Sequence, residues 1–206
     1  LFPMISSTIH IVMPTDFPGL FIYLLREFAV GFMIGFIMNL IFAAVQIAGE
    51  FISIQIGISM SQILDPVTGA SSPILSQMFI ILASFVFLAL NAHQWLFAAI
   101  YKSYTAFPPG LDFVFTGGVV ENILHLSGQM FFIAISMILP VFCVMFVSEV
   151  LMGFMSKMMP QMNIFMVAIP FKIYIGVILI LMFISPTATY LSNTIQSYFQ
   201  GIVEMM

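Results

Sequence analysis

The chain contains apolar runs that are longer than a lipid bilayer is thick. The first extends from Gly19 to about Ile56. As a single helix of about 38 residues it would be near 57 Å long, at roughly 1.5 Å per residue. The hydrocarbon core of a bilayer is only about 30 Å thick. Each long run is therefore expected to be a tight hairpin, a kinked helix, or a helix that other proteins shield.

Three further apolar runs follow the first, separated by clusters of Pro, Gly and Ser that predict loops. They extend over residues 74–107, about 119–158 and 164–185. Pro140 predicts a kink in the middle of the run 119–158. An amphipathic helix is expected over 187–206, and residues 1–13 have the composition of the end of an earlier apolar segment. The predicted fold class is all-α: a polytopic helical membrane protein of long, kinked or tilted hairpins, with residues 1–206 belonging to a single helical subunit.

The composition supports a membrane protein. Hydrophobic residues make up 62% of the chain and charged residues only 6%, whereas a soluble domain has about 25% charged residues. An aqueous enzyme and a disordered tail are therefore excluded. Four Lys and Arg residues are too few to bind a nucleic acid through its phosphates. The single cysteine, Cys143, excludes an internal disulfide.

Small and polar residues recur on one face of each long run when it is treated as a helix. In the first run this face carries Gly31, Gly35, Asn39, Ala43, Gln46, Glu50, Ser53 and Gly57; in the next it carries Gln77, Ser84, Asn91, Ala98 and Lys102; in the third it carries Glu121, His125, Gln129 and Ser136. Small residues allow close helix packing in membranes, and amides hydrogen-bond across helices.

Two interpretations of these faces remain open: hydrogen bonding between helices of one bundle, or a hydrated conduit between subunits. The faces are rich in amides and poor in charge, which favours assembly contacts over a proton relay. Seven positions are predicted to pack against other subunits and are called the seam residues below: Gly31, Gly35, Asn39, Gln46, Gln77, Asn91 and Gln129.

Three charged residues are predicted to lie at membrane depth: Glu50, Glu149 and Lys172. Charges there are costly, and they usually pair with each other or face a water-filled cavity. The candidate partners of Lys172 are Glu149, Glu50 and Asp65. A structural ion pair and a moving charge are both compatible with the sequence.

No pattern of a known catalytic or metal site occurs. The sequence lacks HExxH, GxSxG and a Walker loop, and its three histidines are too far apart for metal-ligand spacing. We therefore expect no catalytic, cofactor or metal site. A cluster of methionines surrounds the turn at 159–163, and such residues either fill a core or form an adaptable surface: Met152, Met155, Met158, Met159, Met162 and Met166.

Three segments resemble one family, and they occur in its order across nearly the whole chain. They are AAVQIAGEFISIQIGISMSQILDP at 43–66, FLALNAHQWL at 87–96 and MPQMNIFMVAIPFKIYIG at 159–176. These segments resemble the FliR/SctT family of type III export-gate membrane proteins. The Pro-Gln-x-Asn-x-Phe turn favours the flagellar branch over the injectisome branch. Ala92 stands where the family usually has Gly between Asn and His.

The resemblance implies a subunit that assembles with FliP and FliQ into a gated pore for unfolded flagellar proteins, with FlhB as a further contact. It implies strongly tilted hairpins arranged in a cone, a location in the bacterial inner membrane at the flagellar basal body, and no enzymatic activity. It also implies a hydrophobic helix ahead of Leu1.

The loop at 57–72 is the predicted pore plug of this family. It is longer than the roughly 2–8 residues usual between helices, and it combines apolar side chains that could seal a pore with glycines and an Asp-Pro turn. The alternative is a plain solvent-exposed linker. The predicted plug residues are Gly57, Ile58, Met60, Ile63, Leu64, Asp65, Pro66 and Gly69.

Two other functions remain possible from the sequence. In a secondary transporter or ion-channel subunit, Lys172 and Glu50 would bind the substrate or the coupling ion, although no inverted repeat with paired broken helices is evident. In a scaffold subunit, the loops would never touch cargo.

Overall fold

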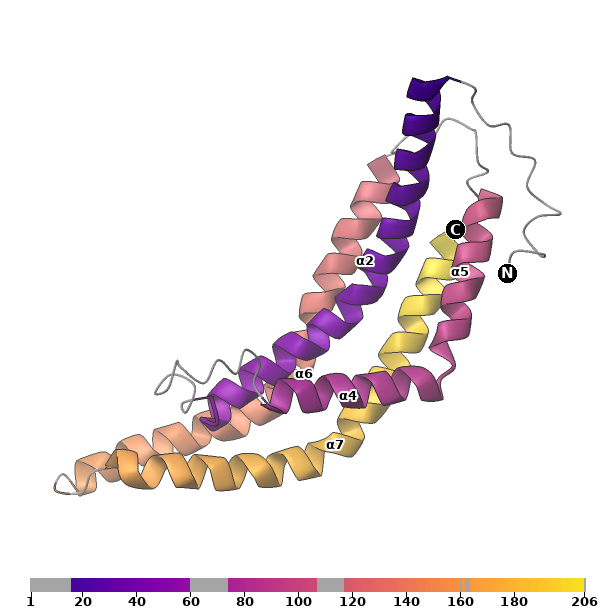
Figure 1. Cartoon of the computed structure of the whole chain (residues 1–206). Helices are drawn as coiled ribbons and strands as arrows, with labels where there is room; N and C mark the ends of the chain where they lie inside the picture. Colours follow the sequence, from indigo (N-terminus) through magenta and orange to yellow (C-terminus); the bar gives the residue numbers. More distant parts are fainter. Residues whose placement is uncertain (1–15, 60–73, 107–116, 160, 162–163, 206) are drawn as a thin grey trace. The chain divides into compact units, whose positions relative to one another are not determined.

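The computed structural model describes residues 16–59, 74–106, 117–159, 161 and 164–205, and nearly all of these are helical. Figure 1 shows the five helices: α2 (Phe17–Ile56), α4 (Ile74–Ala89), α5 (Ala92–Ala106), α6 (Gly117–Met158) and α7 (Ile164–Met205). No strand occurs in these described ranges. The all-α prediction is confirmed.

Local sequence signals explain both ends of α2. The carbonyl of Asp16 accepts the first helical hydrogen bond, from the Leu20 amide at 3.0 Å, and Asp is favoured at this capping position. Pro18 lies in the first turn, where its missing N–H costs nothing. At the other end, Gly57 has a φ of 89° and its amide donates to the carbonyls of Ser53 and Ile54. Glycine ends helices in this way because it lacks a Cβ.

The run predicted over 74–107 is not one helix. It breaks after Ala89, and the two parts, Ile74–Ala89 and Ala92–Tyr104, are bent by 69°. Asn91 has a φ of 54°, and its carbonyl accepts a hydrogen bond from the Gln94 amide. Asparagine tolerates this left-handed geometry and also favours helix starts. The shared face predicted from Gln77 to Lys102 was therefore wrong, because the bend separates its two halves.

Prolines inside α6 and α7 do not end these helices. Pro140 lies within α6, and Pro170 and Pro186 lie within α7. Each proline removes one backbone hydrogen bond and favours a kink. The tail predicted as a separate helix over 187–206 is instead the continuation of α7 through Pro186, since α7 extends to Met205.

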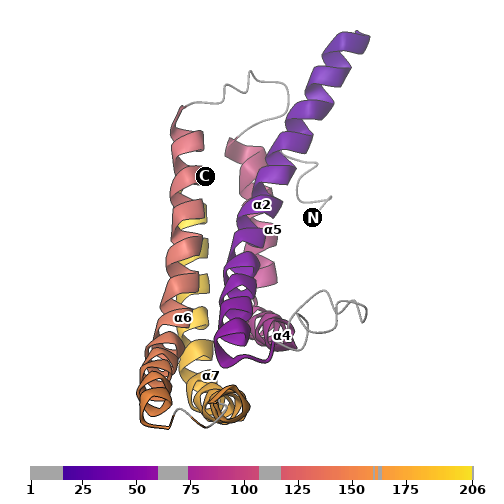
Figure 2. The ribbon, with the colours of Figure 1, turned by 90° about the vertical axis from the view of Figure 1, so that its left-hand side faces the viewer.

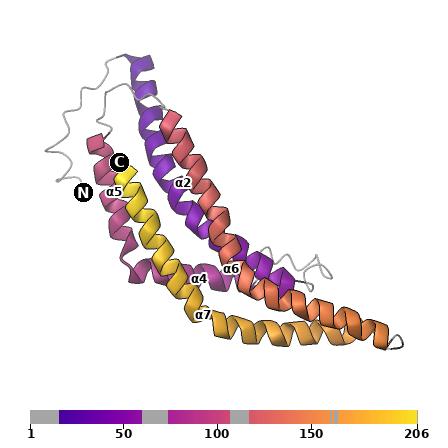
Figure 3. The same ribbon diagram turned by 180° about the vertical axis from the view of Figure 1, so that it is seen from behind.

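The chain divides into two compact units, and the long helices contribute to both. The first unit comprises residues 1–41, 86–129 and 192–206. Within it, α2 and α6 run in one direction, while α5 and the end of α7 run in the other (Figure 1). The second unit comprises residues 42–85 and 130–191. There α6 and α7 form an antiparallel hairpin (Figures 1 and 3), and α4 lies along the end of α2 (Figure 2).

Each unit has a small apolar core and a largely apolar exterior. In the second unit, Ala44, Ile56 and Met145 are fully buried. Large apolar side chains are exposed elsewhere, such as Phe132 at 70% and Met166 at 79%. Helices that are apolar all round are covered by lipid or protein. Three of the described helices are long and apolar enough to cross a membrane, and α4 with α5 would make a fourth if the bent pair forms one span.

Candidate functional site

A charged pair joins α6 to α7 in the second unit. The Lys172 Nζ donates to the Glu149 Oε1 at 2.6 Å. The side chains are partly shielded, with 23% of Lys172 and 40% of Glu149 exposed. Of the three partners considered from the sequence, the structure places Glu149 beside Lys172. A close pair at this level of burial has the geometry of a structural tie between helices.

Gln55 on α2 is a third member of this cluster, and the sequence analysis missed it. Its Nε2 donates to the same Glu149 Oε1 at 3.3 Å, although the two residues are 94 positions apart. The carboxylate of Glu149 therefore links α2, α6 and α7. Gln55 lies off the small and polar face of α2, so no periodic pattern could have selected it. We call Gln55, Glu149 and Lys172 the polar cluster.

Glu50 does not belong to the polar cluster. Its Oε1 accepts a hydrogen bond from the Gln46 Nε2 at 3.0 Å, one turn earlier on the same helix. This contact satisfies the carboxylate locally. Asp65, the third candidate partner of Lys172, lies outside the described residues.

The structure describes only the first residues of the predicted plug. Gly57 ends α2, and the hydroxyls of Ser53 and Ser59 are hydrogen-bonded at 2.8 Å in a buried position. This contact turns the chain back toward the last turns of α2. The remaining predicted plug residues lie outside the described ranges: Met60, Ile63, Leu64, Asp65, Pro66 and Gly69.

The seam residues lie on the surface of the part of the chain that the structure describes. All seven are exposed: Gly31, Gly35, Asn39, Gln46, Gln77, Asn91 and Gln129. On the opposite side of α2, by contrast, Ile37, Leu40 and Ala44 are buried. The described core is therefore mainly apolar, and the amides of the seam residues are not used to hold this chain's own helices together.

Two glycines permit close helix contacts that the sequence analysis did not single out. A Cβ on Gly49 would lie 2.6 Å from the Ser76 Cα, so α2 and α4 meet backbone to backbone. The Ser76 hydroxyl also donates to the Gln46 carbonyl at 3.2 Å. A Cβ on Gly176 would lie 2.5 Å from side-chain carbons of Ile56. The sequence signal for Gly49 was present in the AGE segment, but nothing local identified what it packs against.

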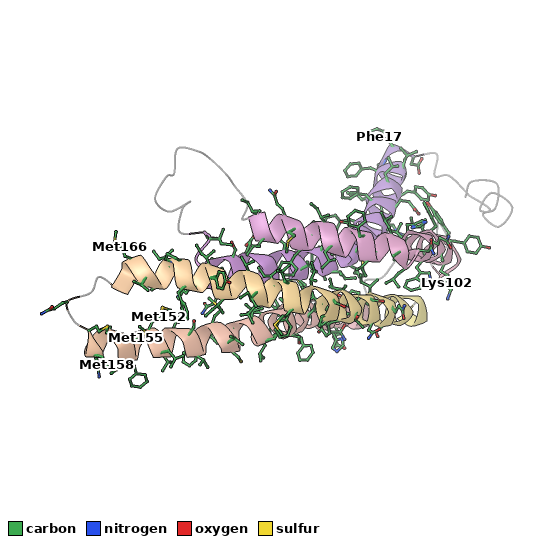
Figure 4. The ribbon with its side chains drawn as sticks, turned by 90° about the horizontal axis from the view of Figure 1, so that it is seen from below. Phe17, Lys102, Met152, Met155, Met158 and Met166 are labelled. Carbon is green, nitrogen blue, oxygen red and sulfur yellow. The ribbon has the colours of Figure 1, made fainter. Side chains whose placement is uncertain are left out.

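The methionine cluster lies at the tip of the α6–α7 hairpin. Figure 4 shows Met152, Met155 and Met158 on α6, with Met166 at the start of α7. Met158 is 82% exposed and Met155 is 51% exposed. This part of the cluster is therefore an exposed surface within the described chain, whereas Met162 lies outside the described residues.

No group of three or more His, Cys, Asp or Glu side chains suited to a metal ion occurs among the residues that the structure describes. The polar cluster contains one acid, one base and one amide, and the carboxylate of Glu149 accepts a hydrogen bond from each of the other two. What the described site offers is helix pairing and an exposed polar surface.

Comparisons with known proteins identify the family. The profile described as "Bacterial export proteins, family 1" matches residues 1–198. The chain is 35% identical over 166 residues to the flagellar biosynthetic protein FliR of Bacillus subtilis, covering 78% of this chain and 62% of that protein. It is 25% identical over 182 residues to FliR of Escherichia coli, covering 88% and 69%. It is 27% identical over 179 residues to FliR of Aquifex aeolicus, covering 87% and 69%.

These matches confirm the resemblance found in the sequence. The chain spans about two thirds of the length of these relatives, from 62% to 69%. Their names and the long apolar helices indicate a membrane protein of the flagellar apparatus. The chain belongs to the family of bacterial export proteins, family 1, as a flagellar member of the FliR type.

Proposed function

We propose that this chain is a core subunit of the flagellar type III export gate. It assembles with FliP and FliQ, contacts FlhB, and forms part of a gated pore for unfolded flagellar proteins in the bacterial inner membrane. Its role is transport rather than catalysis. Family membership supports the flagellar export role, and the partners and the pore are the proposal.

The observation that carries the proposal is the exposure of all seven seam residues. Apart from Gln46, whose amide is bonded to Glu50, the side-chain amides among them cannot be left facing lipid, because an unsatisfied polar group in hydrocarbon costs several kcal/mol. The chain's own helices bury an apolar core instead. Neighbouring protein subunits supply both hydrogen-bond partners and close helix contacts. A scaffold or gate made of several subunits therefore fits this chain better than a transporter that works alone.

Co-purification tests the assembly. A tagged chain, extracted in mild detergent, is expected to retain FliP-type and FliQ-type subunits, and the chain alone is expected to aggregate or be degraded by protease. A monodisperse, protease-resistant monomer that retains no companion would contradict the proposal. It would favour the alternative of a secondary transporter or channel subunit. Retention of injectisome companions instead of flagellar ones would favour the SctT branch.

The plug is tested separately in the assembled complex. The loop is proposed to close the pore by keeping its constriction dry. Removing Met60 to Ser71 and bridging the gap with a short Gly–Ser linker keeps the Ser53–Ser59 hydrogen bond. The expected result is normal complex yield with increased ion flux across the membrane. Normal yield without added leak would return this loop to the linker interpretation and leave a scaffold role.

A further inference from the structure

A cavity lies between α2 and α5 in the first unit, and glycines on α2 create it. Its volume is about 270 Å³, and its lining includes Gly31 and Gly35 of α2 and Ile100 of α5. A Cβ on either glycine would meet no atom within 4 Å. The hollow is therefore open space that the described residues of this chain do not fill.

One end of the cavity is acidic. Glu27 is the only charged residue in the lining, and Ser103 and Tyr104 lie at the same cavity. The side chain of Glu27 is half-buried. A carboxylate on a long apolar helix usually pairs with a cation or faces water, and the cavity lining contains no Lys or Arg. The cavity therefore has an apolar floor and an anionic end.

The acidic and glycine residues of α2 that line the cavity belong to a row that leads to a polar residue, Asn39. Glu27, Gly31, Gly35 and Asn39 follow one another at four-residue spacing, which is the ridge-and-groove row of an α-helix. Where this row consists of glycines it is a groove that accepts the ridge of another helix. Asn39 is exposed on it. A lipid tail would leave that amide without a partner, whereas a helix can supply one.

We propose that this groove, defined by Glu27, Gly31, Gly35 and α5, receives an apolar helix of a companion gate subunit that carries a Lys or Arg. The ridge of that helix fills the hollow over the glycines, and its basic side chain pairs with Glu27. The inference rests on the proposed assembly, and it adds the surface and the chemistry of the partner.

Photo-cross-linking in the assembled complex identifies the occupant. A photoreactive amino acid is placed at Gly31, where the open space accommodates a side chain, and at Gly128 of α6, where a Cβ also meets nothing within 4 Å. We expect cross-links from position 31 to a helix of a companion subunit, close to a Lys or Arg. Cross-links only to phospholipid, only to a second copy, or only to another segment of this chain would overturn the proposal.

Matched substitutions test whether a partner helix fits the groove and whether the Glu27 carboxylate forms the ion pair. Gly31→Leu fills the groove, while Gly128→Leu makes the same change on an exposed part of α6. Glu27→Gln removes the proposed ion pair, while Glu121→Gln removes an exposed carboxylate elsewhere in the first unit. We expect Gly31→Leu and Glu27→Gln to lower the retained companion about tenfold, with little change for the two controls.

A charge exchange gives the most specific result. Glu27→Lys should abolish retention, and replacing the cross-linked basic residue of the companion by Glu should restore it. Retention unchanged by Gly31→Leu and Glu27→Gln would refute the groove while leaving the proposed assembly intact. If the unmodified chain retains no companion at all, the proposed function itself has failed.

Discussion

Replacing Lys172 by Met is expected to destabilise the second unit by about 1–2 kcal/mol. The Nζ–Oε1 distance of 2.6 Å corresponds to a gross attraction of roughly 6 kcal/mol at an effective dielectric constant of about 20. Solvent screening removes much of this, because 23% of the Lys172 side chain and 40% of the Glu149 side chain are exposed. Exposed pairs contribute about 0.2–1 kcal/mol, whereas breaking a fully buried pair costs about 3–5 kcal/mol. Because the pair is partly buried, the loss on breaking it is expected to lie between these two ranges.

The variant leaves Glu149 with only one of its two hydrogen-bond donors, Gln55. Glu149→Gln should therefore recover at least half of the loss caused by Lys172→Met, because it removes the unpaired charge. Glu50→Gln should recover nothing, because Glu50 is bonded to Gln46 on its own helix.

The assay is unfolding of the chain within its purified complex, in mixed micelles with increasing denaturing detergent, followed by the protease resistance of the tagged chain. The two single variants and the double variant form a double-mutant cycle, which isolates the pair energy from other effects. Lys157→Met, in the exposed last turn of α6, is the matched control and should change the unfolding free energy by less than about 0.5 kcal/mol. A coupling energy below about 0.3 kcal/mol would refute this argument.

Three further substitutions test the packing of the helices. Gly49→Ala should destabilise the contact between α2 and α4, because its Cβ would lie 2.6 Å from the Ser76 Cα; overpacking costs about 1–3 kcal/mol and exceeds the gain of about 1 kcal/mol in helix propensity. Gly176→Ala should destabilise to a similar extent, since its Cβ would lie 2.5 Å from a fully buried isoleucine of α2. Tyr198→Phe should cost about 1 kcal/mol, because the buried hydroxyl donates to the Leu126 carbonyl at 3.0 Å. All three are measured by the same unfolding titration.

The control substitutions for these variants are expected to stabilise the chain or to leave its stability unchanged. Gly153→Ala lies inside α6 with open space around it, so it should stabilise the chain by up to about 1 kcal/mol. Tyr174→Phe affects a tyrosine that is 72% exposed and should have no measurable effect. If Gly49→Ala stabilised the chain, as Gly153→Ala is expected to do, the close backbone contact between α2 and α4 would be excluded.

The sequence by itself determined the helices and the character of their surfaces. The run predicted from Gly19 to Ile56 is α2 within two residues, because an aspartate, a proline and a terminal glycine define its ends through local geometry. The same holds for α6, predicted over about 119–158 and observed over Gly117–Met158. The exposed positions of Gly31, Gly35 and Asn39 on α2 also followed from periodicity, since a helix fixes which residues share a face.

Only the tertiary structure decided which helices meet and where. The sequence offered three acidic partners for Lys172, and the partner depends on the register of α6 against α7, which no local pattern contains. Gln55 joins Glu149 across 94 positions for the same reason. The sequence did not reveal the break at Asn91, because the residues on both sides of it are apolar. The helix ends there because the backbone of Asn91 is left-handed. Continuity of α7 through Pro186 was hidden because a proline bends a helix or ends it according to the packing around it. Helix formation is local physics, whereas helix pairing depends on side chains brought together from distant parts of the chain.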